Sequence, residues 1–408
     1  MERSEKKDFE IYLHIPFCVR KCGYCDFLSG PCDERTKELY VEALCREIAA
    51  ARNMAADRAA EGRAAGNPSP AGKTGENRTE ERDRKVSSVF LGGGTPSLLT
   101  PRQIDRVFDA LYQSFSLTPD AEITMEANPG TLDEERLRAM KEAGVNRLSL
   151  GLQSTEDTLL RILGRIHTWR DFRESWDLVR KHGFDNVNID LMFALPEQTR
   201  EIWQNTLRTA AAMSPEHLSC YSLILEEGTP FAAQELRLPD EETEYEMYED
   251  TSEILSAYGY RQYEISNYAR EGRACRHNIG YWIRREYLGL GLGASSLWEN
   301  ERFSNTRDLK QYLEWDWEHD RYADTLREER IPLSREEAMA EFMILGLRMT
   351  EGVSCRAFLE EFGRTPESLY AEILEKYRKL GLLVCSKDRI ALTRPGIHVS
   401  NRIMAEFL

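Results

Sequence analysis

Six short runs of aliphatic, β-branched and aromatic residues alternate with helical patterns along the first part of the chain. Apolar residues recur at helical spacing between the runs, for example in 36–50, 101–115, 133–142 and 169–182. Strands that alternate with helices in this way form parallel sheets, because each helix carries the chain back across one face of the sheet. The pattern therefore predicts an α/β fold, a partial (β/α)6 barrel. The predicted strands are 11–15, 88–91, 122–125, 147–150, 187–193 and 218–225.

The remainder of the chain predicts a second, smaller unit. Helical patterns at 335–347 and 366–380 precede a possible β-hairpin, VCSKDRIALTRPGIHVS, which is typical of a helix-rich, winged-helix-like C-terminal domain. Residues 51–85 are polar and lack apolar periodicity, so they are expected to form a flexible surface insertion. The expected division is a barrel core at 1–230, a connecting region at 231–330 and a C-terminal domain at 331–408.

Charge and cysteine content restrict the class of protein. The 408-residue chain carries a formal net charge of −16, which argues against a nucleic-acid partner because phosphates require clustered Lys and Arg. There is no apolar run of the roughly 20 residues that a membrane span needs. The charged N-terminus resembles no signal peptide. Nine cysteines, three of them within eight residues, suit a metal site in a reducing compartment, so we expect the cytoplasm.

Polar or glycine-rich groups follow five successive predicted strands. They occur in HIPFCVRKCGYC, GGGTPS, EANPG and GLQS, and within NIDLMFALP. In α/β barrels the loops at the carboxyl ends of the strands meet at one mouth. The sequence therefore predicts one cavity lined by these segments.

The first of these segments predicts an iron–sulfur cluster. Cys18, Cys22 and Cys25 can each supply a thiolate to one iron of a [4Fe-4S] cubane. The fourth iron then has no ligand from this loop and is open to a substrate or cofactor, as in catalytic metal sites. A zinc site is the alternative, but it normally needs four ligands. Cys32 follows Pro31 on the way into the next helix, and we expect it to be a free cysteine.

The other strand ends supply groups that can hold a small ligand. The glycines of the GGGTPS segment allow close approach of the backbone, although a glycine run alone is as typical of a tight turn. Glu126, Gln153, Arg165 and Asp190 can bind an amino group, a ribose and a carboxylate. Each could be structural on its own, but a barrel mouth gathers them into one cavity.

These segments carry a resemblance that covers nearly the whole chain. YLHIPFCVRKCGYC, FLGGGTPS, MEANPG, LGLQS and IDLMFALP resemble the oxygen-independent coproporphyrinogen oxidase-like radical S-adenosylmethionine (SAM) proteins. In that family the open iron binds the amino and carboxylate groups of SAM, and one electron then yields a 5′-deoxyadenosyl radical. The resemblance implies that the SAM cavity is lined by Tyr12, Tyr24, Gly93, Gly94, Thr95, Glu126, Gln153, Arg165 and Asp190.

Two features separate the branches of this family. The true oxidases carry a further cysteine two positions after the triad and a longer N-terminal arm, whereas this chain has Phe27 there and 17 residues before Cys18. The segment CRHNIGYW instead resembles the HNxxYW signature of the haem chaperone branch, HemW. His277 and Cys275 are competent haem ligands beside two aromatic side chains, so we expect haem to contact this segment and His277. The alternative is a core motif whose side chains simply pack.

The leading hypothesis is a haem-binding protein that passes haem to an acceptor protein and lacks coproporphyrinogen oxidase activity. The resemblance also implies an electron donor to the cluster and leaves open a dimer that depends on the cluster. Two alternatives remain at this point. One is an oxygen-independent coproporphyrinogen III oxidase, and the other is a haem carrier whose cluster has only a regulatory role.

Overall fold

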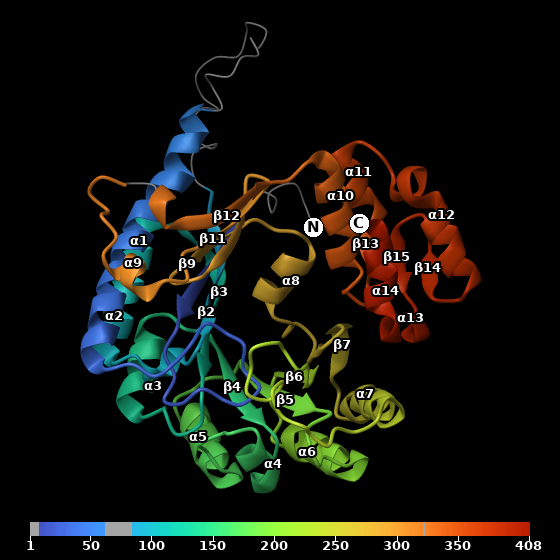
Figure 1. Ribbon diagram of the computed structural model, residues 1–408, viewed down its shortest axis with the longest axis horizontal. Coiled ribbons are helices and arrows are strands. Elements are labelled where there is room, and N and C mark those ends of the chain that lie inside the picture. Colours follow the sequence, from blue (N-terminus) through green and yellow to red (C-terminus); the bar gives the residue numbers. More distant parts are fainter. Residues whose placement is uncertain (1–7, 62–83, 321–322) are drawn as a thin grey trace, which may run out of the picture.

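A curved sheet of six parallel strands forms the centre of the molecule and confirms the predicted partial barrel (Figure 1). The computed structural model describes residues 8–61, 84–320 and 323–408. Consecutive strands are neighbours in the sheet, as expected when each is followed by a helix. The strands are β1 (Phe9–Ile15), β2 (Val86–Gly93), β3 (Leu117–Ala127), β4 (Arg147–Gln153), β5 (Val187–Phe193) and β6 (His217–Ser222).

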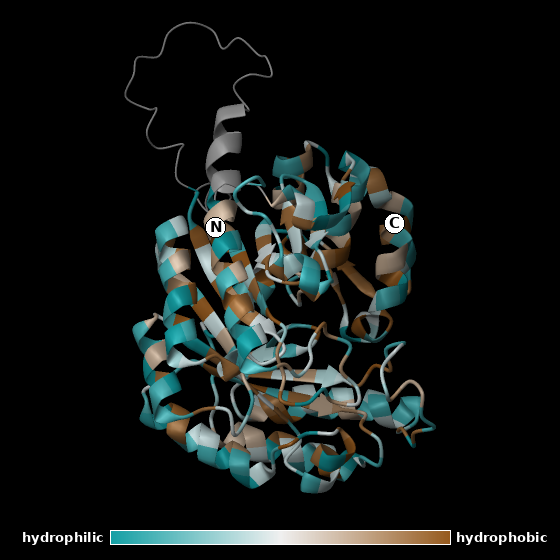
Figure 2. Ribbon diagram, turned by 60° about the vertical axis from the view of Figure 1, so that its left-hand side comes forward, coloured by the Kyte–Doolittle hydropathy of each residue, from teal (hydrophilic) through white to brown (hydrophobic). Residues whose placement is uncertain are grey.

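Helices cover the outer face of this sheet (Figure 1). Two of them begin at threonine capping boxes, Thr100 and Thr168, which fix their first turns. The strands are hydrophobic and much of the helices' surface is hydrophilic (Figure 2), as expected for a core between sheet and helices. The helices are α1 (Glu34–Glu61), α2 (Pro101–Ser114), α3 (Glu134–Glu142), α4 (Asp157–Ile162), α5 (Trp169–Lys181) and α6 (Arg200–Ala212).

The inner face of the sheet is built from layers of side chains in register. Successive side chains of a strand point to opposite faces, so Glu10, Tyr12 and His14 of β1 share one face. Their register partners on β2 are Ser88, Phe90 and Gly92. The layers therefore run from the amino ends of the strands, where they are polar, to the carboxyl ends, where the cavity lies.

The region predicted to lie between the two domains adds strands to both edges of the sheet. β9 (Tyr287–Leu290) pairs in parallel with β1, and β10 (Ser295–Trp298), β11 (Glu301–Asn305) and β12 (Arg327–Pro332) continue from it. At the other edge, β8 (Asn267–Ala269) and β7 (Arg261–Glu264) follow β6. The described residues of the region also form the α-helices α7 (Glu241–Ala257), α8 (Arg276–Trp282) and α9 (Leu309–Leu313).

The C-terminal residues form a separate hydrophobic core around Met343, Phe358 and Ile403. The predicted hairpin is present as β14 (Leu383–Cys385) and β15 (Arg389–Leu392), and β13 (Val353–Ser354) pairs with β15. This unit contacts the barrel through α8, where Arg348 lies 4.3 Å over the ring of Trp282. Its helices are α10 (Arg335–Gly346), α11 (Cys355–Phe362), α12 (Pro366–Lys379), α13 (Arg394–His398) and α14 (Ser400–Met404).

Two further expectations concern the predicted insertion and the absence of a membrane-spanning helix. The predicted insertion begins within α1, which continues to Glu61, and its residues 62–83 lie outside the described residues. In the part of the chain that is described, no helix has both the length and the apolar character for a membrane span.

Candidate functional site

A cavity of about 450 Å³ opens at the carboxyl ends of the strands. Loops after β1 to β6 line it, which is the location that the strand-end segments predict. Most of the residues predicted to bind a cluster or a cofactor are therefore brought together. Those that line the cavity are Cys18, Cys22, Tyr24, Cys25, Gly93, Gly94, Thr95, Glu126, Gln153, Arg165 and Asp190.

The cysteine loop leaves β1 and is closed at its base by backbone hydrogen bonds. The N–H of Cys18 donates to the carbonyl of Gly30 at 2.9 Å, and the N–H of Gly30 donates to Pro16 at 3.0 Å. Neighbouring strand ends then reach the thiols: the Thr95 hydroxyl lies 3.7 Å from the sulfur of Cys18, and the Arg165 guanidinium 3.7 Å from that of Cys22. The loop is thus held against the residues that follow β2 and α4.

The chemistry of the three thiols suits an iron–sulfur cluster. Burial raises the pKa of Cys25, and the thiols of Cys22 and Cys18 raise it further. Thiolates that lie close together destabilise one another. Bound iron offsets this destabilisation, because the deprotonated thiolate is the form that binds the metal. Within the described residues no three His, Cys, Asp or Glu side chains are arranged around a single metal ion. A cubane takes one thiolate per iron, so its ligands need not meet at one point.

The glycines after β2 are required by close backbone approach. A Cβ atom on Gly94 would lie 2.6 Å from the carbonyl oxygen of Phe17, and one on Gly93 would lie 2.3 Å from the ring of His14. Gly93 also has a φ of +107°, which L side chains rarely adopt. The glycine run therefore lets the end of β2 pass directly beneath the cysteine loop.

The charged residues that line the cavity include Glu126, Asp190 and Arg165. Burial, and Asp190 nearby, raise the pKa of Glu126 to about 8. Asp190 is held by Ser149 at 2.9 Å and Asn188 at 2.8 Å, and burial raises its pKa as well. Arg165 donates to the carbonyl of Gly151 at 2.8 Å, while its Nε is buried and has no hydrogen-bond partner among the described residues. This set of donors and acceptors suits a ligand that carries both an amino and a carboxylate group.

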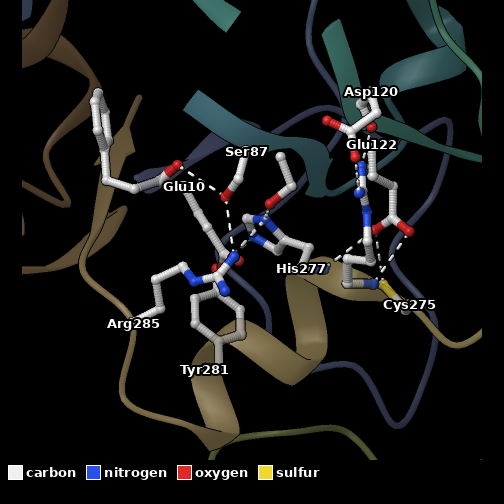
Figure 3. Close-up of polar contacts among 11 residues, drawn as sticks. Glu10, Ser87, Asp120, Glu122, Cys275, His277, Tyr281 and Arg285 are labelled. Atoms are coloured by element: carbon white, nitrogen blue, oxygen red, sulfur yellow. Dashed lines mark hydrogen bonds and ion pairs between the residues drawn. The ribbon is translucent and has the colours of Figure 1, made fainter. Parts of the chain in front are cut away.

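Two predicted residues do not line the cavity. Tyr12 lies one layer below it, with its hydroxyl 3.1 Å from Nδ1 of His14. His277 is 1% exposed on α8, which lies against the amino ends of the strands (Figure 3). Its Nδ1 is 2.8 Å from the Ser88 hydroxyl, and its Nε2 is 2.9 Å from the hydroxyl of Tyr281.

The surroundings of α8 are those of a buried core. Burial, with Arg147 and Arg285 nearby, lowers the pKa of His277 to about 3. Burial also raises the pKa of Cys275, whose thiol lies 3.4 Å from a carboxylate oxygen of Glu122. The packing alternative describes this arrangement, and the role of His277 toward haem stays a prediction.

Some cavity residues were not singled out from the sequence. The side-chain amide of Asn128 donates to the hydroxyl of Thr95 at 2.7 Å and accepts from the guanidinium of Arg165 at 2.5 Å. In the sequence, its position in EANPG, after β3, is the feature that could have identified it. An apolar rim was also missed. It consists of Val19, Phe27, Ile166, Tyr221 and Ile224.

Comparison with known proteins agrees with this geometry. Residues 74–210 match the model of the radical SAM superfamily, and residues 333–399 match the HemN C-terminal domain. "Heme chaperone HemW" of Bacillus subtilis is 36% identical over 97% of this chain and 98% of that protein. The protein of the same name from Lactococcus lactis is 33% identical over 99% and 98%.

Among solved structures, coproporphyrinogen III oxidase (HemN) from Escherichia coli has a TM-score of 0.80. The match covers 98% of this chain and 90% of that one, at 24% sequence identity. This likeness concerns the fold, including the C-terminal domain.

Proposed function

The chain belongs to the HemW family of radical SAM proteins, and on that premise we propose that it binds haem and transfers it to an acceptor protein. As a radical SAM protein it uses a [4Fe-4S] cluster and SAM, and the cluster supplies one-electron chemistry when bound. Cys18, Cys22 and Cys25 would hold it. Glu126 would accept hydrogen bonds from the amino group of SAM, and Arg165 is the cation available to its carboxylate.

The observation that carries the haem proposal is the apolar rim of the cavity. Val19, Phe27, Ile166 and Ile224 are between 52% and 66% exposed, and all four line the cavity. A cluster of exposed large apolar side chains around a concave site marks a binding surface. Haem is a flat, mostly apolar molecule, so its ring can cover these side chains.

Charge at the rim suits the polar edge of haem. Arg20 donates to the carbonyl of Gly164 at 2.7 Å and Lys21 to that of Phe27 at 2.9 Å. Both side chains are exposed, and these backbone oxygens hold their charged groups in place. They belong to the same loop as Val19 and Phe27 of the rim, on a chain whose net charge is −16. Haem carries two propionates, which these cations can pair with. We therefore place haem over the cavity mouth.

The test is anaerobic reconstitution followed by a haem titration monitored by absorbance. Replacement of Phe27 and Ile224 by Ser should weaken haem binding by about tenfold or more, since burying one such side chain contributes about 1.5–3 kcal/mol. Leu380→Ser is the matched control, because Leu380 is 61% exposed but belongs to the C-terminal domain. Haem release to an apo-haem protein would then measure transfer.

His277→Asn distinguishes the two candidate haem sites. Unchanged binding in the rim variants, with loss in His277→Asn, would place haem at α8 and reject the rim. Turnover of coproporphyrinogen in the same sample would favour the oxidase alternative. Cluster content, measured as iron and sulfide, shows in each case that the variant is assembled.

The proposal also includes an electron donor, a cellular compartment and an oligomeric state. An electron donor would reach the cluster from the exposed side of the cysteine loop, where Arg20 and Lys21 would favour an acidic protein. We also propose the cytoplasm as the compartment and a dimer that forms only with the cluster in place. Size determination of cluster-loaded and cluster-free protein tests the dimer.

A further inference from the structure

Three aromatic side chains cross the inside of the barrel from α8 toward the cavity. The ring of His277 stacks on Phe90 with centroids 5.2 Å apart and an interplanar angle of 28°. Phe90 in turn stacks on Tyr12 with centroids 6.3 Å apart and an angle of 26°. These side chains come from α8, β2 and β1, and Phe90 and Tyr12 are register partners in the sheet. They form a continuous stack, which we call the barrel stack.

The upper end of the barrel stack reaches the cysteine loop. The hydroxyl of Tyr12 lies 3.1 Å from Nδ1 of His14, and Nε2 of His14 lies 2.9 Å from the carbonyl oxygen of Leu28. Burial lowers the pKa of His14, so its ring is neutral. A neutral ring that donates from Nε2 to Leu28 must accept at Nδ1, so the hydroxyl of Tyr12 donates to it. Leu28 lies three residues after Cys25.

Hydrogen bonds hold the lower end of the barrel stack, which is His277 on α8. Both ring nitrogens of His277 face hydroxyl groups, and the backbone N–H groups of Arg276 and His277 each donate to the carboxylate of Glu122 at 3.1 Å. Figure 3 shows α8 held in this way against β1, β2 and β3. The ring of His277 therefore has one position relative to the sheet.

We propose that the barrel stack makes His277 a positioning residue for the iron–sulfur cluster. Packed interiors transmit displacement because they contain few voids. A shift of α8 would move Phe90 and Tyr12, and through His14 it would move the segment of the cysteine loop at Leu28. The HNIGYW segment then controls how the loop presents its cluster to SAM, although it lies at the opposite end of the barrel.

The experiment compares two buried histidines. His277→Asn disturbs the barrel stack, whereas His217→Asn is a matched control outside it. His217 is also fully buried, with its ring nitrogens 2.7 Å from Asn188 and 2.9 Å from Tyr263. The readouts are the electron paramagnetic resonance spectrum of the reduced cluster with and without SAM, its midpoint potential, and the Kd of SAM. No haem is added, so the outcome is independent of where haem binds.

We expect His277→Asn to alter the spectrum and the midpoint potential and to weaken SAM binding by between about twofold and 30-fold, the span of measured couplings of this kind. His217→Asn should leave the spectrum without SAM and the midpoint potential unchanged. Its partner Asn188 also holds Asp190 of the cavity, so the Kd of SAM is compared only among the parent, His277→Asn and the Phe90 variants. Phe90→Leu keeps an apolar side chain but removes the stacked ring, and should reproduce the effect, while Phe90→Tyr should keep the parent spectrum.

Two outcomes would overturn the proposal. One is a parent-like spectrum, potential and Kd in both His277→Asn and Phe90→Leu at normal iron and sulfide content. The other is an equal effect of His217→Asn on the spectrum without SAM and on the midpoint potential, which would indicate a general loss of packing. If His277→Asn fails to fold, the pair Phe90→Leu and Phe90→Tyr decides.

Discussion

The carboxylate of Glu126 accepts a hydrogen bond from the backbone N–H of Gly93 at 3.2 Å, yet its pKa is raised to about 8. Burial, together with Asp190, outweighs this single hydrogen bond. In the unfolded chain the same group has an ordinary pKa of about 4.3. Between these two values the folded protein holds a proton that the unfolded chain has released.

This difference predicts that stability falls as pH rises from about 5 to 8, because the folded state binds more protons than the unfolded state over that range. The contribution of Glu126 is at most about 5 kcal/mol. Glu126→Gln should make the free energy of unfolding less dependent on pH, as measured by anaerobic urea denaturation at pH 5.5 and pH 8. An equal slope in parent and variant would contradict the pKa shift.

SAM binding should show the opposite pH dependence at the same residue. The amino group of SAM donates hydrogen bonds to the ionised form of Glu126, so affinity should rise between pH 6 and 8 by up to about tenfold per pH unit. Glu126→Gln should bind SAM more weakly and without this rise, as measured by calorimetry on reconstituted protein. Glu135→Gln, an exposed carboxylate on α3, is the control and should titrate like the parent.

The cluster prediction concerns the choice of three cysteines from the four nearby. Replacing Cys18, Cys22 or Cys25 by Ala should abolish the [4Fe-4S] signal, because one iron then loses its protein ligand. Cys32→Ala should retain it, since Cys32 does not line the cavity. Iron and sulfide analysis after reconstitution checks both statements. Loss of the cluster in Cys32→Ala would mean that four cysteines bind it and that no iron is open to SAM.

The barrel and its mouth were predictable because their signals are local. A short apolar run, followed by a polar loop and a helix such as the one capped at Thr100, identifies each β/α unit by itself. The parallel order then brings the strand ends together, which is why Glu126 and Asp190 could be placed in one cavity from the sequence. No contact between distant residues had to be known.

The position of the HNIGYW segment was not predictable for the opposite reason. His277 is buried because it meets Ser88 and Glu122, which precede it by more than 150 positions in the chain. In a sequence, a buried histidine with hydroxyl partners has the same pattern as an exposed one beside a ligand. The strands β7 to β12 were missed as well, because most have only three to five residues and show no clear alternation.

The last prediction concerns the packing of α8 at Gly280. A Cβ atom there would lie 2.0 Å from Oε1 of Glu10, which is fully buried. Burial raises the pKa of Glu10, and Arg285 is 3.5 Å from the same oxygen (Figure 3). Glu10 has no solvent to move into, so α8 itself must shift. Gly30 is the matched control, because no atom of the described part of the chain lies within 4 Å of a Cβ atom built there.

Gly280→Ala should therefore destabilise the protein although Ala is the better helix former. Helix propensity favours Ala by about 1 kcal/mol, whereas overpacking a core costs about 1–3 kcal/mol and the displaced carboxylate adds to that cost. We expect a net loss of about 1–3 kcal/mol for Gly280→Ala and a change below about 0.5 kcal/mol for Gly30→Ala, by denaturant unfolding. Combining Gly280→Ala with Glu10→Ala removes the clash, so the double variant should lose less than the sum of the single variants. Strict additivity would show that the two residues do not share the contact and that α8 accommodates the methyl group elsewhere.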